Sequence, residues 1–467
     1  MLSFLIFFPI LAACLIVVLG KKNADLARMI TAIVCKLELI IIFFLWIKSN
    51  NTGWTYAESV AWMPQIGITY KLAMDGFSLV MLLITAFLSV IAIGVGWHSI
   101  KQWHNFGPLM LVMLSGLNGV YLSFDLFLLF IFWEVMLIPM YFMICFWGSG
   151  KAKQAAMRFL LFTVVASLLM LAGIIALYLL KSKESGAPPN FAFDILFSSP
   201  VKTGAMWITL AFLVGFGVKV PAFPLHSWAP DTYKFANPAV TILLAGAMSN
   251  AGIYGILRVC PFLSPESMSL LCKAGMALAA IGTVYMGLIA YRQHNIRSIA
   301  VYSSISHMNL AMLGIFALQL QAINGAMTQL IAHAFSITGI FAIVAMLEIR
   351  GFSGDFSAMG GLFKRMPQLA SFFLFFIIAS IGVPGLGNFV AEILILAGSY
   401  QVSVMWTILA ATSIVIGVAY FLRMYEYTML GPLNTNYHET TLTDTSWREW
   451  YILILLAIAI LWLGLYS

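Results

Sequence analysis

Long apolar runs separated by short polar stretches dominate the chain and predict membrane-spanning helices. A helix needs about 20 mostly apolar residues to cross the hydrocarbon core of a bilayer. Reading each run against its polar interruptions predicts about fourteen spans. The predicted spans are 3–19, 29–47, 72–97, 107–122, 125–147, 156–180, 204–223, 239–259, 267–291, 299–318, 323–347, 369–396, 402–424 and 450–465. No basic stretch precedes the first run, so we interpret it as a retained helix rather than a secretion signal.

Composition agrees with an all-α polytopic membrane protein. Of 467 residues, 62% are hydrophobic and 9% are charged, and the mean hydropathy is +0.99, a balance that indicates lipid as the solvent. The five cysteines never form a CxxC pair, and no glycine-rich fingerprint opens a helix after a strand. We therefore expect this chain to bind no iron–sulfur cluster, metal or nucleotide itself.

Basic residues are distributed unequally between the two sides of the predicted membrane. With an even number of spans both ends of the chain share a side, and alternate connections can be assigned to opposite sides. Of the 24 Lys and Arg residues, two lie inside spans, Lys36 and Lys219. Seven lie on the less basic side: Lys48, Lys71, Lys181, Lys183, Lys202, Arg258 and Lys273. The other 15 mark the cytoplasmic side, which places both termini on the non-cytoplasmic side. The net charge of +7 thus reflects topology, and nucleic-acid binding explains it poorly.

Two predicted spans are interrupted by proline and glycine. The seventh runs into Val-Pro-Ala-Phe-Pro, with Pro221 and Pro224, and the twelfth contains Gly-Val-Pro-Gly-Leu-Gly around Pro384. The breaks are five spans apart, an odd number, so a repeat of spans four to eight and nine to thirteen would be inverted in the membrane. This predicts four regions: 1–106, a first repeat at 107–260, an inverted second repeat at 261–426, and 427–467.

A carboxylate and a lysine stand inside neighbouring spans. Glu134 is mid-way along the fifth, and Lys219 lies just before the break in the seventh. A charge at the bilayer centre costs at least about 2.5 to 3.5 kcal/mol, so such residues need partners or hydrated cavities and usually mark function. The two groups would then influence each other's protonation. The alternative is a static ion pair that fixes helix register.

Further polar groups lie in spans ten to twelve. His307 follows Ser303 and Ser304, and His333 stands between Gln329 and Ser336. Histidine titrates near neutral pH, and hydroxyls and amides can hold water between titrating groups. Glu392, eight residues after Pro384, would be the last acidic group in this series. Packing roles inside the core are the alternative for all three titratable residues.

Three other residues receive weaker interpretations. His226 follows Pro224 at the cytoplasmic mouth of the seventh span, where it is either a proton uptake group or a surface residue. Lys36 and Glu38, two positions apart in the second span, point to different faces and cannot form a helical salt bridge. We assign both to a contact with a neighbouring subunit.

Several motifs resemble one protein family over nearly the whole chain. The matching stretches are FDLFLLFIFWEVMLIPMYFMICFWG, GFGVKVPAFPLHSWAPD, SIAVYSSISHMNLAM, TQLIAHAFSITGIF and MGGLFKRMPQLASFFLFFIIASIGVPGLGNFVAEILILAGSYQ. They resemble the antiporter-like M subunits (mitochondrial chain 4) of proton-pumping NADH:quinone oxidoreductase, respiratory complex I. This resemblance implies fourteen helices with two inverted five-helix repeats, and a proton path rather than a redox centre.

The resemblance also implies a role for each matching residue. Glu134 and Lys219 would form the coupling pair, His307 and His333 the central relay, and Glu392 the exit group. Glu392 distinguishes the M type, because L, N and Mrp antiporter subunits usually carry lysine there. One position departs from the family: Asn250 stands where a lysine is usual. Asparagine cannot titrate, so a hydrated path through Ser249, Asn250 and the histidines would have to replace lysine-to-lysine transfer.

The sequence therefore predicts a proton-translocating subunit of complex I, a non-redox part of the enzyme. NADH, FMN, iron–sulfur clusters and quinone would be bound by partner subunits, and L-type and N-type antiporter-like subunits would be its membrane partners. We expect it in a bacterial inner membrane, with an organellar membrane as the alternative. The competing functions are a subunit of an Mrp-type cation/proton antiporter or a membrane-bound hydrogenase, and a divergent paralogue that partners an inorganic-carbon uptake protein.

Overall fold

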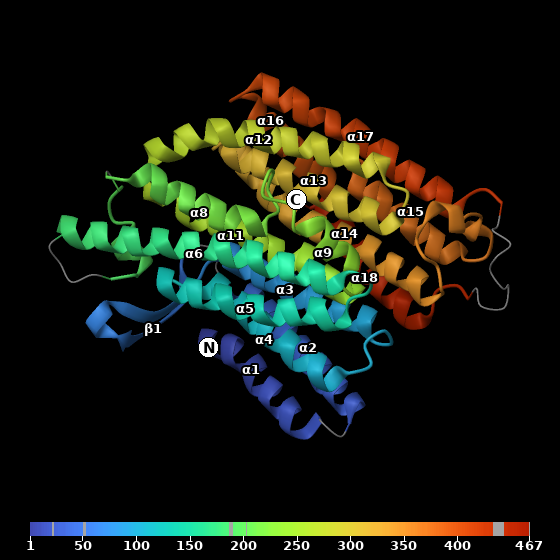
Figure 1. Cartoon of the computed structure of the whole chain (residues 1–467), viewed down its shortest axis with the longest axis horizontal. Coiled ribbons are helices and arrows are strands. Elements are labelled where there is room, and N and C mark those ends of the chain that lie inside the picture. The colour runs from blue at the N-terminus through green and yellow to red at the C-terminus, as the bar shows by residue number, and fades with distance from the viewer. Residues whose placement is uncertain (21–22, 50–52, 186–189, 202, 433–442, 467) are drawn as a thin grey trace.

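The computed structural model is a bundle of helices that run side by side (Figure 1). It describes all residues except 21–22, 50–52, 186–189, 202, 433–442 and 467. The first half comprises α1 (Leu2–Leu19), α2 (Ala24–Lys48), β1 (Thr55–Met63), β2 (Ile68–Met74), α3 (Gly76–Gly96), α4 (Trp103–Leu122), α5 (Leu126–Trp147), α6 (Ala152–Ser185), α7 (Phe193–Leu196), α8 (Ala205–Lys219), α9 (Ala229–Phe235) and α10 (Pro238–Leu243). The second comprises a π-helical turn (Leu244–Met248), α11 (Ser249–Leu263), α12 (Pro265–Arg292), α13 (Ile296–Phe316), α14 (Leu320–Ile349), α15 (Pro367–Ile381), α16 (Gly387–Tyr400), α17 (Val404–Met429) and α18 (Trp447–Leu465). Short 3₁₀ turns lie at Pro64–Ile66, Phe356–Ala358 and Leu362–Lys364.

The helices match the predicted polytopic architecture. In the described part of the chain, twelve helices are long and apolar enough to cross a membrane. Three shorter apolar helices, α8, α15 and α16, fall where the sequence predicts interrupted spans. The count of fourteen and the inverted repeats stay predictions, because length and composition do not decide whether the short helices complete spans.

The central helices are buried and the outer ones face the surroundings. In an 18-residue apolar stretch of α14, and likewise of the Pro238–Leu263 segment, 94% of the residues are buried. The corresponding share is 33% in α2 and 28% in α17. Figure 1 places α1 and α17 at opposite edges of the bundle. Polar residues on α11, α13 and α14 are therefore enclosed by protein, whereas those on α2 or α17 can face outward.

The strictly all-α prediction is wrong between α2 and α3. There β1 and β2 form an antiparallel two-stranded sheet, joined through Gly67 in the left-handed conformation. In Ile68–Met74 polar Thr69 and Lys71 alternate with apolar neighbours, a period of two that suits a strand and not a helix. The predicted third span therefore begins at Gly76, not at residue 72.

The break in the seventh predicted span is confirmed, and side chains satisfy its backbone. Helix α8 ends at Lys219, and α9 begins at Ala229. From α13, Asn309 accepts a hydrogen bond from Phe223 N–H at 2.9 Å and donates to Pro221 O at 3.4 Å. Trp228 donates its indole N–H to Val218 O at 2.9 Å. Unpaired peptide groups are costly at membrane depth, so these contacts are what allow the break.

The break in the twelfth predicted span is built on the same principle. Helix α15 ends at Ile381 and is capped by Gly382, which adopts a left-handed φ of 80°, and α16 begins at Gly387. Asn388 donates to Ala379 O at 2.8 Å and to Ser336 Oγ on α14 at 2.9 Å. At each break a buried asparagine side chain thus forms hydrogen bonds with backbone groups that the interrupted helix leaves unpaired. The sequence did not predict this role for Asn309 or Asn388.

At the start of α3 a charge pair gives a pH-dependent contribution to stability. Asp75 caps α3, and its carboxylate lies 2.7 Å from Arg258 Nη2 on α11. Burial would raise the pKa of Asp75, but the hydrogen bond and charge of Arg258 hold it below its usual value.

We therefore expect acid to destabilise this junction. A carboxyl group with a lowered folded-state pKa stabilises the protein above its unfolded value, about 3.9, and this contribution is lost as pH falls through the folded-state pKa. Acid unfolding of the detergent-solubilised protein, followed by circular dichroism, should show less acid sensitivity in Asp75→Asn than in the wild type. Equal acid sensitivity of the two proteins would contradict this prediction.

Candidate functional site

Lys219 is the end point of α8 and lies deep in the protein. Only 2% of its surface is exposed, and Nζ lies 5.4 Å from the ring centres of both Trp133 on α5 and Phe159 on α6. A lysine in the last turn is also favoured by the helix dipole. Gly252 on α11 packs against the same residue, since a Cβ there would lie 3.1 Å from Lys219 Cβ. The lysine is thus held between three helices by aromatic faces and by close packing.

Glu134 on α5 and Lys219 on α8 lie on helices whose side chains meet at Trp133 and Phe216, with ring centres 5.3 Å apart, but the two ionisable groups form no ion pair. Buried Glu134 Oε1 and Lys219 Nζ both lack a hydrogen-bond partner among the described residues. The static ion pair considered as an alternative is therefore absent from this structure. A buried ionisable group without a fixed partner responds strongly to any charge or water that approaches it. This arrangement suits a group that changes protonation better than one that only fixes packing.

A π-helical turn precedes Asn250, the position that departs from the family. The turn covers Leu244–Met248, and π turns inside helices frequently mark functional sites. Asn250 donates to Gly246 O within the turn at 2.8 Å and to Leu330 O on α14 at 3.3 Å. Ser249 donates to Ala245 O at 2.7 Å. The amide thus joins the helix that packs on Lys219 to the helix that carries His333, one turn after Leu330.

The two histidines meet across α13 and α14. Their rings stack with centres 5.2 Å apart, and His333 Nε2 lies 3.0 Å from Ser304 Oγ. His307 Nδ1 lies 3.3 Å from Gln329 Nε2 and 3.4 Å from Glu392 Oε1 on α16. Ser304 and Gln329 therefore each contact the histidine of the opposite helix, and not the histidine that lies near them in the sequence.

Glu392 completes this cluster and is 4% exposed. Its carboxylate packs against Gly382 in the second break, where a Cβ would lie 2.6 Å from Oε2. Next to it is a cavity of about 10 Å³, on the order of the space that one water needs. The lining includes the hydroxyl residues Thr283, Ser306, Ser380, Ser413 and Tyr420, with His307 and Glu392. The cavity lining thus combines five hydroxyl-bearing residues, an imidazole and a carboxylate, which makes a polar site inside an apolar bundle.

His226 lies apart from this cluster, in the first break. It stacks on Phe223 with ring centres 5.6 Å apart and is half-buried. Its Nδ1 is buried without a hydrogen-bond partner among the described residues. It is therefore not a simple surface residue, and its role as an uptake group stays a prediction.

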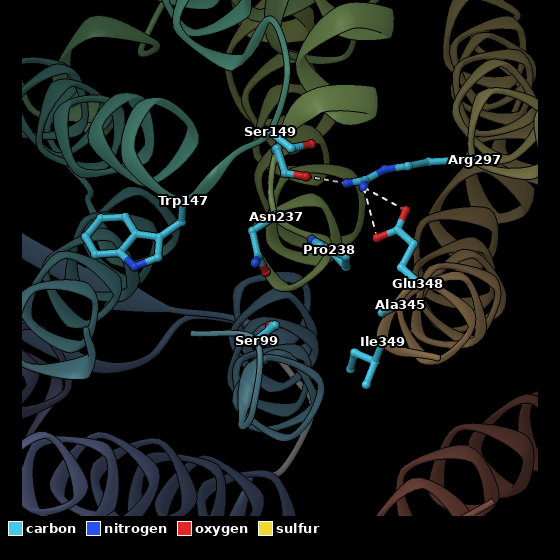
Figure 2. Close-up of a pocket in the computed structure, with 10 residues that line it drawn as sticks. Ser99, Trp147, Ser149, Asn237, Pro238, Arg297, Ala345, Glu348 and Ile349 are labelled. Atoms are coloured by element: carbon cyan, nitrogen blue, oxygen red, sulfur yellow. Dashed lines mark hydrogen bonds and ion pairs between the residues drawn. The ribbon is translucent and has the colours of Figure 1, made fainter. Parts of the chain in front are cut away.

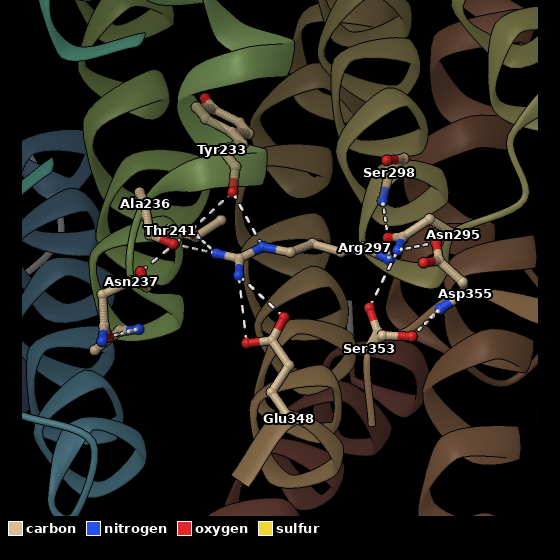
Figure 3. A network of polar contacts seen from close by, with 11 residues as sticks. Tyr233, Ala236, Asn237, Thr241, Asn295, Arg297, Ser298, Glu348, Ser353 and Asp355 are labelled. Atoms are coloured by element: carbon tan, nitrogen blue, oxygen red, sulfur yellow. Dashed lines mark hydrogen bonds and ion pairs between the residues drawn. The ribbon is translucent and has the colours of Figure 1, made fainter. Parts of the chain in front are cut away.

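Arg297 belongs to a second polar network, which the sequence analysis counted only as a loop charge. It is 7% exposed, and Figure 3 shows its guanidinium between α9, α10 and α14. It donates to Tyr233 O at 3.3 Å, to Ala236 O, to Thr241 Oγ1 at 3.1 Å, and to both oxygens of Glu348 at 3.0 and 3.3 Å. These contacts use both terminal nitrogens and Nε, so the arginine joins the helix that leads to Asn250 with the helices of the histidines.

A cavity of about 240 Å³ opens beside this network (Figure 2). Its lining residues are Ser99, Trp147, Ser149, Ala236, Asn237, Pro238, Arg297, Ala345, Glu348 and Ile349. They lie in connections that the sequence assigns to the basic side or, for Trp147 and Ala345, at the ends of the predicted spans next to those connections. Sequence reasoning missed this site because Arg297 stands at a helix start with ordinary polar neighbours, and only the fold brings Glu348 and the α9 carbonyls to it.

Glu38 does not fulfil its predicted role. It is fully buried, and Asn118 on α4 donates to its Oε1 at 3.2 Å. The same amide donates to Leu5 O at 2.9 Å, a carbonyl left free because Pro9 has no N–H. Glu38 therefore joins α2 and α4 inside this chain and cannot contact a neighbouring subunit.

Within the part of the chain that the structure describes, no group of three or more His, Cys, Asp or Glu side chains could hold a metal ion. The site consists instead of isolated ionisable residues that are enclosed by apolar helices and joined by hydroxyl and amide groups. The fold and this site define an integral, multi-pass membrane protein with titratable groups inside both halves of its helix bundle.

Comparison with known proteins gives the family. The model for the "NADH:quinone oxidoreductase/Mrp antiporter, TM" family matches residues 123–417. The chain belongs to this family. It is 34% identical over 481 residues to NADH-quinone oxidoreductase subunit M of Escherichia coli K12, covering 100% of this chain and 94% of that protein. It is 31% identical to NADH-ubiquinone oxidoreductase chain 4 of Marchantia polymorpha, with 100% and 93% coverage. The resemblance to M subunits is confirmed.

Solved structures agree on the fold. A chain of respiratory complex I from Thermus thermophilus superposes with a TM-score of 0.90 at 26% identity, covering 100% of this chain and 96% of that chain. A chain of the Mrp complex from Dietzia has a TM-score of 0.86 at 19% identity, with 99% and 94% coverage, and shows the shared fold only.

Proposed function

We propose that this chain is the M-type, proton-translocating membrane subunit of an NADH:quinone oxidoreductase. The observation that carries the proposal is the contact series from buried His333 to half-buried His307 to buried Glu392, three titratable groups on three helices. Relatives named as subunit M or chain 4 over the full length support the host complex.

In this proposal His307 passes a proton by changing partners. Gln329 Nε2 can only donate, so its contact suits a neutral His307 whose Nδ1 accepts. When His307 gains a proton, Nδ1 becomes a donor and its partner is Glu392, 3.4 Å away. One ring nitrogen thus has two neighbours of opposite hydrogen-bonding character. His307 would therefore alternate between a neutral state bound to Gln329 and a protonated state that donates to Glu392.

Glu134 and Lys219 would drive that switch from the other half. Their lack of direct contact leaves the charge on Lys219 open to control by the protonation of Glu134. Asn250 and Ser249 would hold water between Lys219 and His333 in place of a titrating lysine. The hydrogen bond that the Asn250 side chain donates to Leu330 O fixes this path to α14.

The proposal includes an arrangement in the membrane. α15 and α16 would together form one span and α8 with its break another, which gives fourteen spans in two inverted repeats at 107–260 and 261–426. Protons would move from the basic side, with both termini on the opposite side of a bacterial inner membrane. Partner subunits of the L and N types would flank the chain, and the subunits that bind NADH, FMN, iron–sulfur clusters and quinone would supply the driving reaction.

Replacing Glu392 by glutamine tests this function. Glu392→Gln keeps the shape and the hydroxyl neighbours but cannot release a proton, so we expect NADH-driven proton transport in membrane vesicles to fall by about tenfold or more. Quinone reduction measured with an uncoupler identifies loss of assembly. The control is Glu426→Gln, at an exposed position on α17. Normal transport in both variants, with the complex intact, would rule out the proposed relay.

A further inference from the structure

One face of α2 is not covered by the rest of the chain. Apolar residues along this face are 39 to 64% exposed, and they recur at the three- and four-residue spacing of a helix face. They are Leu26, Met29, Ile33, Leu37, Ile40, Phe43, Phe44 and Ile47. Lys36 is also exposed and stands in the middle of this row. We call these residues with Lys36 the α2 face.

Lys36 lies at the midpoint of the helix. It is twelve residues from Ala24 and twelve from Lys48, a rise of about 18 Å in each direction. The hydrocarbon core extends only about 15 Å from its centre, and the four-carbon stem of a lysine is much shorter than that. The ammonium group therefore cannot reach the membrane surface, as a lysine near a helix end would.

Nothing in the described part of this chain compensates that charge. Lys36 takes part in no ion pair, hydrogen bond or ring contact there. The nearest acid in sequence, Glu38, points to the other side of α2 and is bound by Asn118. Asp25 lies at the helix start and pairs with Arg28. An exposed charge at mid-membrane depth needs an external partner of opposite charge.

We propose that the α2 face is a docking surface for a transmembrane helix of another subunit, one that carries an aspartate or glutamate at mid-membrane depth. Charge complementarity selects this occupant. A second copy of this chain would bring Lys36 against a face that has no acid, and a symmetric contact would oppose two lysines. Lipid phosphate groups stay at the membrane surface, beyond the reach of the side chain. This inference goes beyond the proposed function, because it names a surface and not a step of proton transfer.

Photo-cross-linking identifies the occupant without removing the lysine. A photoreactive residue replaces Ile33 or Ile40, one turn to either side of Lys36, in cells that assemble the native complex. Cross-linked peptides are then sequenced by mass spectrometry. We expect a membrane segment of a different subunit, with an acidic residue within about one helical turn of the cross-link. Adducts only with lipid, with a second copy of this chain, or with a segment that lacks such an acid would each overturn the proposal.

Charge substitution tests the same surface independently. Lys36→Glu places two acids together, so we expect the cross-linked partner to co-purify at least about tenfold less. In Lys36→Met the carboxyl group of the partner helix can be neutralised by a proton, so co-purification of the partner should fall less than in Lys36→Glu. The control is Lys48→Met, at the helix end. Unchanged co-purification of the Lys36→Glu chain would overturn the proposal. The Glu392→Gln transport assay decides the proposed function separately, since it does not depend on which face the partner covers.

Discussion

Replacing Lys219 by methionine is expected to stop redox-coupled proton transport while leaving the fold intact. Methionine has similar length and fills the space between Trp133 and Phe159, but it carries no proton and no charge. The chain then lacks the group through which Glu134 would act on the second half of the bundle. We expect transport in energised vesicles from the intact complex to fall by about tenfold or more.

Two further variants make this result specific. Lys153→Met, which removes an exposed lysine near the start of α6, should leave transport unchanged. Glu134→Gln should resemble Lys219→Met, since both interrupt the same pair. If Lys219→Met and Glu134→Gln each kept full proton transport, the proposed coupling role of these two residues would be wrong. This conclusion would not depend on the result for Glu392→Gln.

The second large effect concerns stability. Arg297→Gln removes the guanidinium that joins Glu348 to the carbonyls of Tyr233 and Ala236. A glutamine can replace at most part of these contacts, so a carboxylate and peptide oxygens lose their donors inside the protein. Glu348 is 31% exposed and water can solvate it, so the main cost comes from the buried peptide oxygens, about 1 to 3 kcal/mol.

Thermal unfolding of the detergent-solubilised chain measures this cost. The matched control is Arg292→Gln, because Arg292 is exposed five residues earlier and surface substitutions usually change stability by no more than about 0.5 kcal/mol. Equal unfolding temperatures of the two variants would show that the Arg297 network does not hold α9, α13 and α14 together.

Much of the fold follows from the apolar pattern. Each predicted span corresponds to a helix or to a pair of short helices, because a membrane-spanning segment must satisfy its backbone internally and repeat its apolar residues over a fixed length. Pro221, Pro224 and Pro384 located both breaks correctly. The β1–β2 hairpin was missed because its second strand merges with the apolar start of α3.

The candidate site was predicted only in part. His307, His333 and Glu392 were singled out because polar residues stand out in an apolar helix, and the structure places them together. Asn309 and Asn388 were missed, since an asparagine in a helix has no special pattern until the carbonyl or amide that it binds is known. Glu38 was misassigned because spacing along one helix does not tell which neighbour covers each face.

The sequence by itself determined that this is a multi-pass membrane protein, where its helices break, and which ionisable residues lie inside it, because burial in lipid makes every polar residue conspicuous. Only the tertiary structure decided which of these residues touch. Partners on different helices, such as His333 with Ser304 or Arg297 with Glu348, depend on helix packing across distant parts of the chain. The structure thus places His333, His307 and Glu392 in one cluster, Lys219 between aromatic rings, and Lys36 on the outside of α2, where no described residue of this chain pairs with it.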